Sequence, residues 1–283
     1  MATAILAGCS SNPSAVSGAG RTGVDPGNAA FPDGAVAVRG STNQARDGDP
    51  ARGNGGSDPE RGGQAAGDGR SGSPRNAAIH CAAPKLHQGK ASFYPATGAG
   101  NCSFEASAQD RMIGAMNRTE YAGSAVCGTC VLVHGPKADI TIRIVDQCPE
   151  CSVGQIDLSQ EAFAKIADIP RGIVPITWSF VPCSVQGPIV YHFMNGSTQW
   201  WTAVQIRNHQ HAIQKLEYLG SDWRFHSVPR LDYNFFVQAS GMGPGPYTFR
   251  VTDIHGHVLQ DAGIPGGDNV DSPGRRQFPA CLP

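Results

Sequence analysis

The hydrophobic and polar positions of this chain follow two different patterns on either side of residue 85. Between residues 10 and 75, Gly, Ser, Asp, Arg, Ala and Pro dominate, and almost no aromatic side chain occurs. Such a stretch cannot bury enough apolar surface to offset the entropy that a chain loses on folding. We therefore expect residues 1–84 to contain a signal-like start followed by a disordered tether.

Short apolar runs bounded by Gly and Pro begin at about residue 85. The runs typical of β-strands are residues 131–133, 140–145 and 176–181. One helix is predicted after Ser159, which can cap it, and before Pro170, which would stop it. Its apolar face would consist of Ala162, Phe163, Ile166 and Ala167. This pattern predicts a mostly β domain over residues 85–184.

A second set of short alternating segments follows the Gln186-Gly-Pro turn, which we interpret as a hinge. The clearest segments are residues 191–194, 202–207, 214–218, 234–237 and 247–252. In the last of them, Tyr247, Phe249 and Val251 would share one face of a strand. His255-Gly256 then stands where a hairpin turn is needed. Short alternating strands without a helix predict a β-sandwich over residues 187–283.

Length and charge restrict the possible partners. The chain has 283 residues, enough for two domains, and its 22 Lys and Arg nearly balance 23 Asp and Glu for a net charge of −1. This balance gives no reason to expect nucleic acid or an anionic membrane as partner. No apolar run reaches the ~18 residues of a spanning helix.

Nine cysteines are more than a cytosolic protein usually carries. Cys9 stands apart from eight others, which are the disulfide candidates Cys81, Cys102, Cys127, Cys130, Cys148, Cys151, Cys183 and Cys281. An even set in the folded region indicates disulfides and an oxidising compartment, although eight cysteines allow 105 pairings and the sequence assigns none.

Two Cys-x-x-Cys pairs offer a zinc site as an alternative. Seventeen residues lie between Cys130 of the pair Cys127 and Cys130 and Cys148 of the pair Cys148 and Cys151. This spacing fits a four-cysteine zinc site. However, a four-ligand site would leave neighbouring cysteines unused, and an exported protein favours disulfides. We therefore expect disulfides and no metal.

Residues 5–11 around Cys9 resemble the end of a bacterial lipoprotein signal, in which lipid is attached to the cysteine. The stretch lacks a charged start and is shorter than a normal apolar region of a signal. Lipidation of Cys9 and an ordinary frayed terminus both stay open. We expect a secreted, extracellular protein whose single possible membrane attachment is a lipid at Cys9.

Several motifs occur in an order that is specific as a set. Cys-Gly-Thr-Cys at Cys127 precedes Arg-Ile-Val-Asp-Gln-Cys at Arg143, which precedes Ile-Asp-Leu-Ser at Ile156. Gly-Lys-Ala-Ser-Phe-Tyr at Gly89 opens the domain. This order resembles the six-stranded double-psi β-barrel of barwin-like proteins, expansins and family-45 endoglucanases.

The resemblance implies roles for four residues in an open groove. Asp157 matches the carboxylate that is the general acid in family-45 enzymes and that expansin action requires. Asp146 matches a second groove carboxylate, Ser92 takes the place of a groove Thr, and Tyr94 would contact sugar beside them. Without the resemblance, Asp157 would be interpreted as a helix-start carboxylate favoured by the helix dipole.

The hydrolytic pair is incomplete in this sequence. An inverting glycosidase needs a second carboxylate as base. In the related enzymes that base follows the opening aromatic motif, whereas residues 95–98 contain no Asp or Glu. Cys148 also replaces a groove Tyr of bacterial expansins. The pattern favours binding over cleavage, and no catalytic residue is assigned with certainty.

The second domain contains an adjacent tryptophan pair, Trp200-Trp201, and Tyr233. The segment around the pair resembles the second domain of bacterial expansins, a family-63 carbohydrate-binding module, in which two Trp and one Tyr form a linear cellulose-binding platform. Adjacent residues of a regular strand face opposite sides, so the platform needs the pair at a strand start or bulge; core packing is the alternative. Met194 replaces a Lys of the family near the platform.

His209 and His211 also stand close together in the second domain. We interpret them as turn residues after a strand, although two histidines at this spacing could bind a metal.

These observations predict an all-β protein, with a double-psi β-barrel, an immunoglobulin-like β-sandwich and a disordered N-terminal region. The resemblance to bacterial expansins implies a monomer that binds cellulose and other plant cell-wall β-glucans and loosens them without hydrolysis or a cofactor. A family-45-like endoglucanase and a peptidoglycan lytic transglycosylase of the rare lipoprotein A type are the alternatives, the latter with peptidoglycan as partner.

Overall fold

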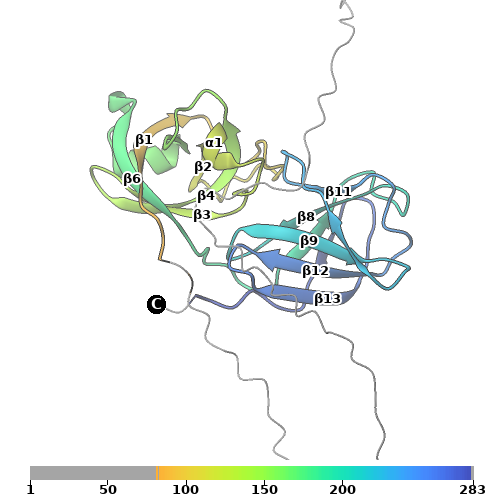
Figure 1. Cartoon of the computed structure of the whole chain (residues 1–283). Helices are drawn as coiled ribbons and strands as arrows, with labels where there is room; N and C mark the ends of the chain where they lie inside the picture. The colour runs from red at the N-terminus through yellow and green to blue at the C-terminus, as the bar shows by residue number, and fades with distance from the viewer. Residues whose placement is uncertain (1–80, 82, 282–283) are drawn as a thin grey trace, which may run out of the picture.

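The structure, a computed structural model, describes residue 81 and residues 83–281 (Figure 1). The predicted tether and Cys9 lie outside these residues. A barrel and a pair of sheets lie side by side, and the chain passes once from the first to the second. Within the described residues, no helix has both the length and the apolar character needed to cross a membrane.

The first body is a closed barrel of six strands in the order β1-β5-β2-β4-β3-β6. Its elements are β1 (His87–Tyr94), β2 (Ile113–Asn117), α1 (Arg118–Tyr121), β3 (Cys130–His134), β4 (Asp139–Cys148), β5 (Ile156–Ser159), α2 (Gln160–Ile166), η1 (Ile169–Arg171) and β6 (Val174–Val181). The pairs β1–β5 and β2–β4 are parallel, and the other pairs are antiparallel. The predicted six-stranded double-psi barrel is confirmed.

Helix α2 begins where the sequence predicted. The Ser159 hydroxyl accepts a hydrogen bond from the Ala162 amide at 3.0 Å, which satisfies one free donor of the first turn. Ala162, Phe163 and Ile166 are fully buried against the barrel. The four-residue helix α1 was not predicted, because one turn has no apolar periodicity to detect.

The second body consists of two four-stranded antiparallel sheets, β10-β9-β12-β13 and β11-β8-β7-β14. Their strands are β7 (Val190–Phe193), β8 (Thr202–Arg207), β9 (Ile213–Leu219), β10 (Phe225–Val228), β11 (Phe236–Gln238), β12 (Tyr247–Asp253), β13 (Val258–Ile264) and β14 (Val270–Pro273). Buried side chains of both sheets, including Tyr191 and Phe249, form one core. The alternation predicted for β12 is present, since Tyr247, Phe249 and Val251 are buried, and the β-sandwich is confirmed.

Hydrogen bonds from side chains to main-chain carbonyls join the two bodies. The Gln205 and Asn234 amides both donate to the carbonyl of Cys102, at 2.8 and 3.2 Å. The Asn208 amide donates to the carbonyls of Gln186 and Pro188, each at 2.7 Å. The bonds to Cys102 join the sandwich to the barrel, and the bonds from Asn208 fix the connecting segment to the sandwich.

All eight described cysteines form disulfides, in the pairs Cys81–Cys281, Cys102–Cys127, Cys130–Cys183 and Cys148–Cys151. The two Cys-x-x-Cys motifs therefore supply no set of four free thiols, and the zinc alternative is wrong. Cys148, which replaces a groove Tyr of bacterial expansins, is in a short disulfide with Cys151. The pair Cys81–Cys281 joins residues 200 positions apart, at the two ends of the described chain.

Candidate functional site

Strand register places the two predicted carboxylates in one row across the barrel. Ala115 on β2 is the register partner of Asp157 on β5 and also of Asp146 on β4, and Ser92 on β1 is the partner of Asp157 on its other side. Partners in register point to the same face of a sheet. Because Ala115 is small, its position leaves space between the two acidic side chains.

Asp157 is half-buried and held by a short relay. The Ser92 hydroxyl donates to Asp157 Oδ1 at 2.6 Å, and the Gln155 amide donates to the Ser92 hydroxyl at 3.0 Å. Burial raises the pKa of Asp157, the Ser92 hydrogen bond opposes that rise, and the negative charges of Glu150 and Asp146 add to it. The helix cap is Ser159, so Asp157 does not serve as the capping carboxylate.

This raised pKa predicts a stabilising substitution. The charged form of Asp157 is less favourable in the folded protein than in the unfolded chain. As the pH rises from the usual Asp pKa through the raised pKa of the folded protein, the free energy of unfolding therefore decreases. Asparagine does not ionise. Asp157→Asn should therefore raise the melting temperature at pH 7 by about 1–3 °C, a small effect because solvent reaches and screens half of the side chain. The difference should disappear at pH 3, and a difference that grows on acidification would contradict the assignment.

Asp146 is fixed by main-chain donors. Its Oδ1 atom accepts hydrogen bonds from the amides of Asn101, at 2.6 Å, and Gln147, at 2.8 Å. The neighbouring Gly100 lies so close that a Cβ atom there would stand 2.4 Å from Asp146 Cγ. The segment before Cys102 is thus packed directly on the Asp146 carboxylate.

Tyr94 lies in the same region, two residues after Ser92 on β1 and so on the same face. Burial raises the pKa of Tyr94 well above its usual range, and the charges of Asp146 and Asp157 raise it further. The phenol therefore stays protonated beside two carboxylates, and its hydroxyl is buried without a hydrogen-bond partner among the described residues.

The tryptophan pair lies in a turn that precedes β8, where strand alternation does not apply. The Thr198 amide donates to the Trp201 carbonyl at 2.7 Å and closes this turn. The Trp200 side chain is 73% exposed, whereas Trp201 is partly buried and packs, together with Tyr233 and Met194, on the buried residues Ala203, Phe235 and Val237. Neither indole lies in the core of the sandwich.

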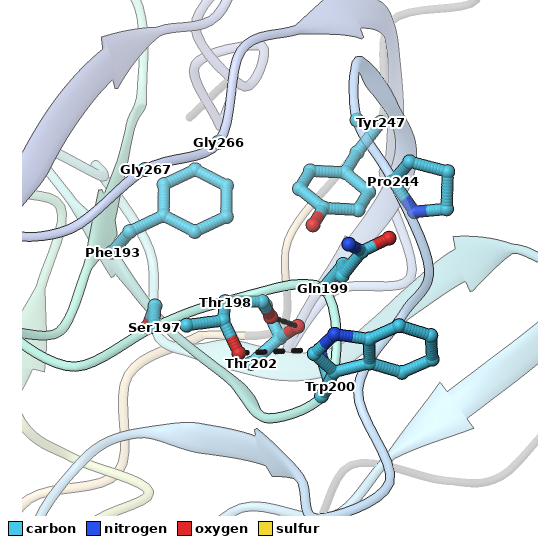
Figure 2. Close-up of a pocket in the computed structure, with 11 residues that line it drawn as sticks. Phe193, Ser197, Thr198, Gln199, Trp200, Thr202, Pro244, Tyr247, Gly266 and Gly267 are labelled. Atoms are coloured by element: carbon cyan, nitrogen blue, oxygen red, sulfur yellow. Dashed lines mark hydrogen bonds between the residues drawn. The ribbon is translucent and has the colours of Figure 1, made fainter.

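Trp200 also borders a pocket of about 490 Å³ (Figure 2). Its other walls include Phe193, Gln199 and Tyr247, and Thr202 donates to the Thr198 carbonyl at 2.8 Å beneath it. Gln199 and the Trp200 ring flank the same opening in Figure 2. The surface beside this indole therefore offers both an apolar face and amide groups.

His209 and His211 do not form a metal pair. His209 is buried, and its Nδ1 atom lies 2.8 Å from the carbonyl oxygen of His211. Both residues belong to the connection between β8 and β9, which confirms the interpretation as turn residues.

One loop, residues 100–103, contacts both the carboxylate row and the aromatic residues. Asn101, whose main-chain amide binds Asp146, donates its side-chain amide to the carbonyl of Asp232 at 2.9 Å. Ser103 donates to the carbonyl of Tyr233 at 2.8 Å. The row of Ser92, Asp157 and Asp146, here called the groove, is thereby joined to Trp200, Trp201 and Tyr233, here called the aromatic strip.

Sequence reasoning missed the residues that make this connection. Asn101 and Tyr121 both bind the Asp232 carbonyl, the latter through its hydroxyl at 2.8 Å, and Gln155 supports Ser92. Gln155 directly precedes the Ile-Asp-Leu-Ser motif and could have been found from that position. Nothing local marks Asn101, because its partner is 131 residues away.

Known proteins are similar to this chain in sequence and in fold. A family model described as lytic transglycolase matches residues 87–178. Expansin-YoaJ of Bacillus subtilis strain 168 is 34% identical over 207 residues, which cover 69% of this chain and 87% of that relative.

Among solved structures, apo Clavibacter michiganensis expansin is similar with a TM-score of 0.65 and 32% identity, over 70% of this chain and 100% of that one. A mutant of that expansin, in complex with cellohexaose, is similar with the same TM-score and 31% identity, over the same shares. The match to a curated expansin above 30% identity, over most of that relative's length, shows that this chain belongs to the expansin family.

Proposed function

We propose that this protein binds cellulose and related β-glucans along the groove and the aromatic strip, and loosens contacts between glucan chains without cleaving them. The observation that carries the proposal is the loop at residues 100–103, which holds Asp146 on one side and the main chain at Asp232 and Tyr233 on the other. A polymer could therefore lie across both regions at once.

The two regions suit different parts of a glucan. The flat rings of Trp200, Trp201 and Tyr233 match the apolar faces of glucose rings and would supply most of the affinity. In the groove, Asp157, Asp146 and Ser92 provide acceptors and donors for sugar hydroxyls, and Tyr94 lies beside them. A chain held by both regions would exchange its hydrogen bonds with neighbouring glucan chains for bonds to the protein.

The lack of a carboxylate at residues 95–98 to act as the base opposite Asp157 supports a non-hydrolytic action. The raised pKa of Asp157 suits a general acid. Inverting hydrolysis also requires a base about 6.5–9.5 Å from the acid, with room for water. Residues 95–98, where related enzymes carry that base, contain no carboxylate. Two main-chain amides donate to one oxygen of Asp146 and hold its carboxylate in place. This fixed carboxylate would serve as a contact for sugar.

The disulfides and the net charge of the protein agree with this function. Four disulfides suit an extracellular protein. The near-zero net charge suits a neutral polysaccharide. We further propose that residues 187–283 act as the family-63 type of carbohydrate-binding module, and that lipid at Cys9 would keep the protein on the envelope of its cell.

A second candidate is peptidoglycan lysis. The family model that matches the barrel is described as lytic transglycolase, and this match favours it. A lytic transglycosylase needs an acid but no separate base for water, so Asp157 would suffice for that chemistry. The sandwich with its aromatic strip has no role in that candidate, and for this reason we favour the glucan.

The test combines retention and turnover on three polymers. The full chain should be retained by crystalline cellulose and should release no reducing ends from soluble β-glucan and no soluble fragments from peptidoglycan. Retention on cellulose with extension of wall strips and without turnover would support the proposal. Steady release of products from any of the polymers would overturn it, and release from peptidoglycan would establish the second candidate.

A further inference from the structure

Three histidines meet at a place outside the groove and the aromatic strip. His211 comes from the connection between β8 and β9, and His255 and His257 come from the hairpin between β12 and β13. The ring of His211 lies 4.8 Å from that of His255 and 6.0 Å from that of His257, and the latter two rings are 5.8 Å apart. Three imidazoles from two separate segments therefore share one small volume.

His257 is oriented by a buried carboxylate. Asp253 is completely buried, and its Oδ2 atom lies 2.6 Å from His257 Nδ1. Its Oδ1 atom accepts the main-chain amides of His255, at 2.9 Å, and His257, at 2.8 Å. This arrangement makes Nδ1 the protonated nitrogen of His257 and leaves the lone pair on Nε2, as in histidine ligands whose second nitrogen donates to a carboxylate.

The Nε2 atom of His257 is the unusual feature of the cluster. His257 is 5% exposed, and in the described part of the chain this nitrogen is buried and has no hydrogen-bond partner. Buried polar atoms in folded proteins nearly always have a partner, so an orphaned nitrogen indicates a group that completes the site.

A hydrogen bond also fixes which ring nitrogen of His211 is free to bind a metal ion. Its Nε2 atom lies 3.2 Å from the carbonyl oxygen of Pro279, so Nε2–H donates a hydrogen bond to that oxygen and the lone pair is left on Nδ1. One ligand atom from each of His211, Asp253 and His257 lies within 4.8 Å of the others. Nitrogen ligands at about 2.0–2.1 Å from a tetrahedral ion are separated by about 3.4 Å. His211 and His257 therefore need only a small contraction, and the His255 ring, 4.8 Å from that of His211, would have to turn a nitrogen toward them.

His255 closes the cluster on its solvent side. It is partly exposed, whereas His211 and His257 are buried, and it therefore marks the path by which an ion would enter. The nearby sulfurs of Cys81 and Cys281 are bonded to each other and offer no thiolate.

We propose that His211, His255 and His257 bind one divalent transition-metal ion, of which Zn²⁺ fits best, with Asp253 as the carboxylate that positions His257. Three imidazoles are ligands that suit Zn²⁺ and not Ca²⁺ or Mg²⁺. The ion would join the β8–β9 connection to the β12–β13 hairpin beside the C-terminal segment. Its role is structural, because no groove residue belongs to the cluster. The sequence alone predicts no metal, because it places His211 only beside His209 and does not show that His255 and His257 lie near it.

Metal binding can be measured directly on the full chain, freed of any affinity tag and stripped with a chelator. Calorimetric titration with Zn²⁺ should give one site per chain with micromolar affinity or tighter, and the melting temperature should rise with the ion. Co²⁺ in its place should give the visible absorption bands of a nitrogen-ligated ion. No site tighter than millimolar in the unaltered chain would overturn the proposal.

Three variants locate the site. His257→Gln should weaken Zn²⁺ binding at least 100-fold, and His255→Ala, at a partly exposed residue that the fold does not need, at least tenfold. His226→Ala is the matched control, because His226 is an exposed histidine paired with Asp222 elsewhere. Unchanged binding in His255→Ala and His257→Gln, or an equal loss in His226→Ala, would contradict the assignment. Retention on cellulose should be the same with and without Zn²⁺, so this test is independent of the proposed function.

Discussion

Asp157→Asn should reduce the extension of cell-wall strips at least tenfold, to the level of buffer alone, while retention on cellulose stays within about twofold. The reason is the division of roles between the two regions. Asp157 is half-buried in the groove and accepts a 2.6 Å hydrogen bond from Ser92. Asparagine keeps the size of the side chain and one acceptor oxygen, but it loses the charge and the ionisable proton of the carboxyl group. The aromatic strip, which we expect to supply the affinity, is left intact.

The same variant separates loss of function from loss of fold. We expect Asp157→Asn to be slightly more stable than the unaltered protein at pH 7, so a decrease in extension cannot be attributed to unfolding. Asp168→Asn is a suitable control, since Asp168 lies just beyond the other end of α2, is 66% exposed, and pairs with Lys137. That control should extend walls normally. Full extension by Asp157→Asn, or a parallel loss of cellulose retention, would show that the groove does not have the proposed role.

The parts of the fold that the sequence predicted well are those with local signals. The capped helix α2 and the alternating strand β12 each contain their pattern within about seven residues, and both are present. No strand was predicted over β1, β2, β5, β10, β13 or β14. Strand β13 has the buried charge of Asp261 in its middle, which accepts a hydrogen bond from Tyr191 on the opposite sheet at 3.0 Å. A charged residue in a strand looks exposed in sequence, because its partner is 70 positions away.

The candidate site shows the same limit more clearly. The resemblance named Asp146 and Asp157, but their arrangement in one row depends on β2, which pairs with β4 on one side and β5 on the other. No property of β2 in the sequence predicts that position. The loop at residues 100–103 and the three histidines also consist of groups brought together by tertiary structure. Sequence motifs therefore identified which residues to consider, and the sheet order determined which of them meet.

The double variant Trp200→Ala/Trp201→Ala should abolish measurable retention on cellulose. Aromatic residues at the centre of a binding surface contribute about 2 kcal/mol or more each, so losing one ring should weaken binding roughly 30-fold. Trp200 alone gives the cleaner result, because its ring is 73% exposed and its removal takes little packing from the fold. Trp201 rests on the buried Ala203 and Phe235, so its variant needs a melting curve beside the binding curve.

Trp223 provides the matched control for this prediction. It lies in the turn between β9 and β10, its side chain is 84% exposed, and the clusters that contain the aromatic strip do not include it. Trp223→Ala removes at least as much exposed indole as Trp200→Ala. If affinity comes from a strip of rings that fits one glucan chain, Trp223→Ala should bind cellulose as the unaltered protein does. If it comes instead from exposed aromatic surface in general, both variants should lose affinity equally, and the aromatic strip would have no specific role in recognising the glucan.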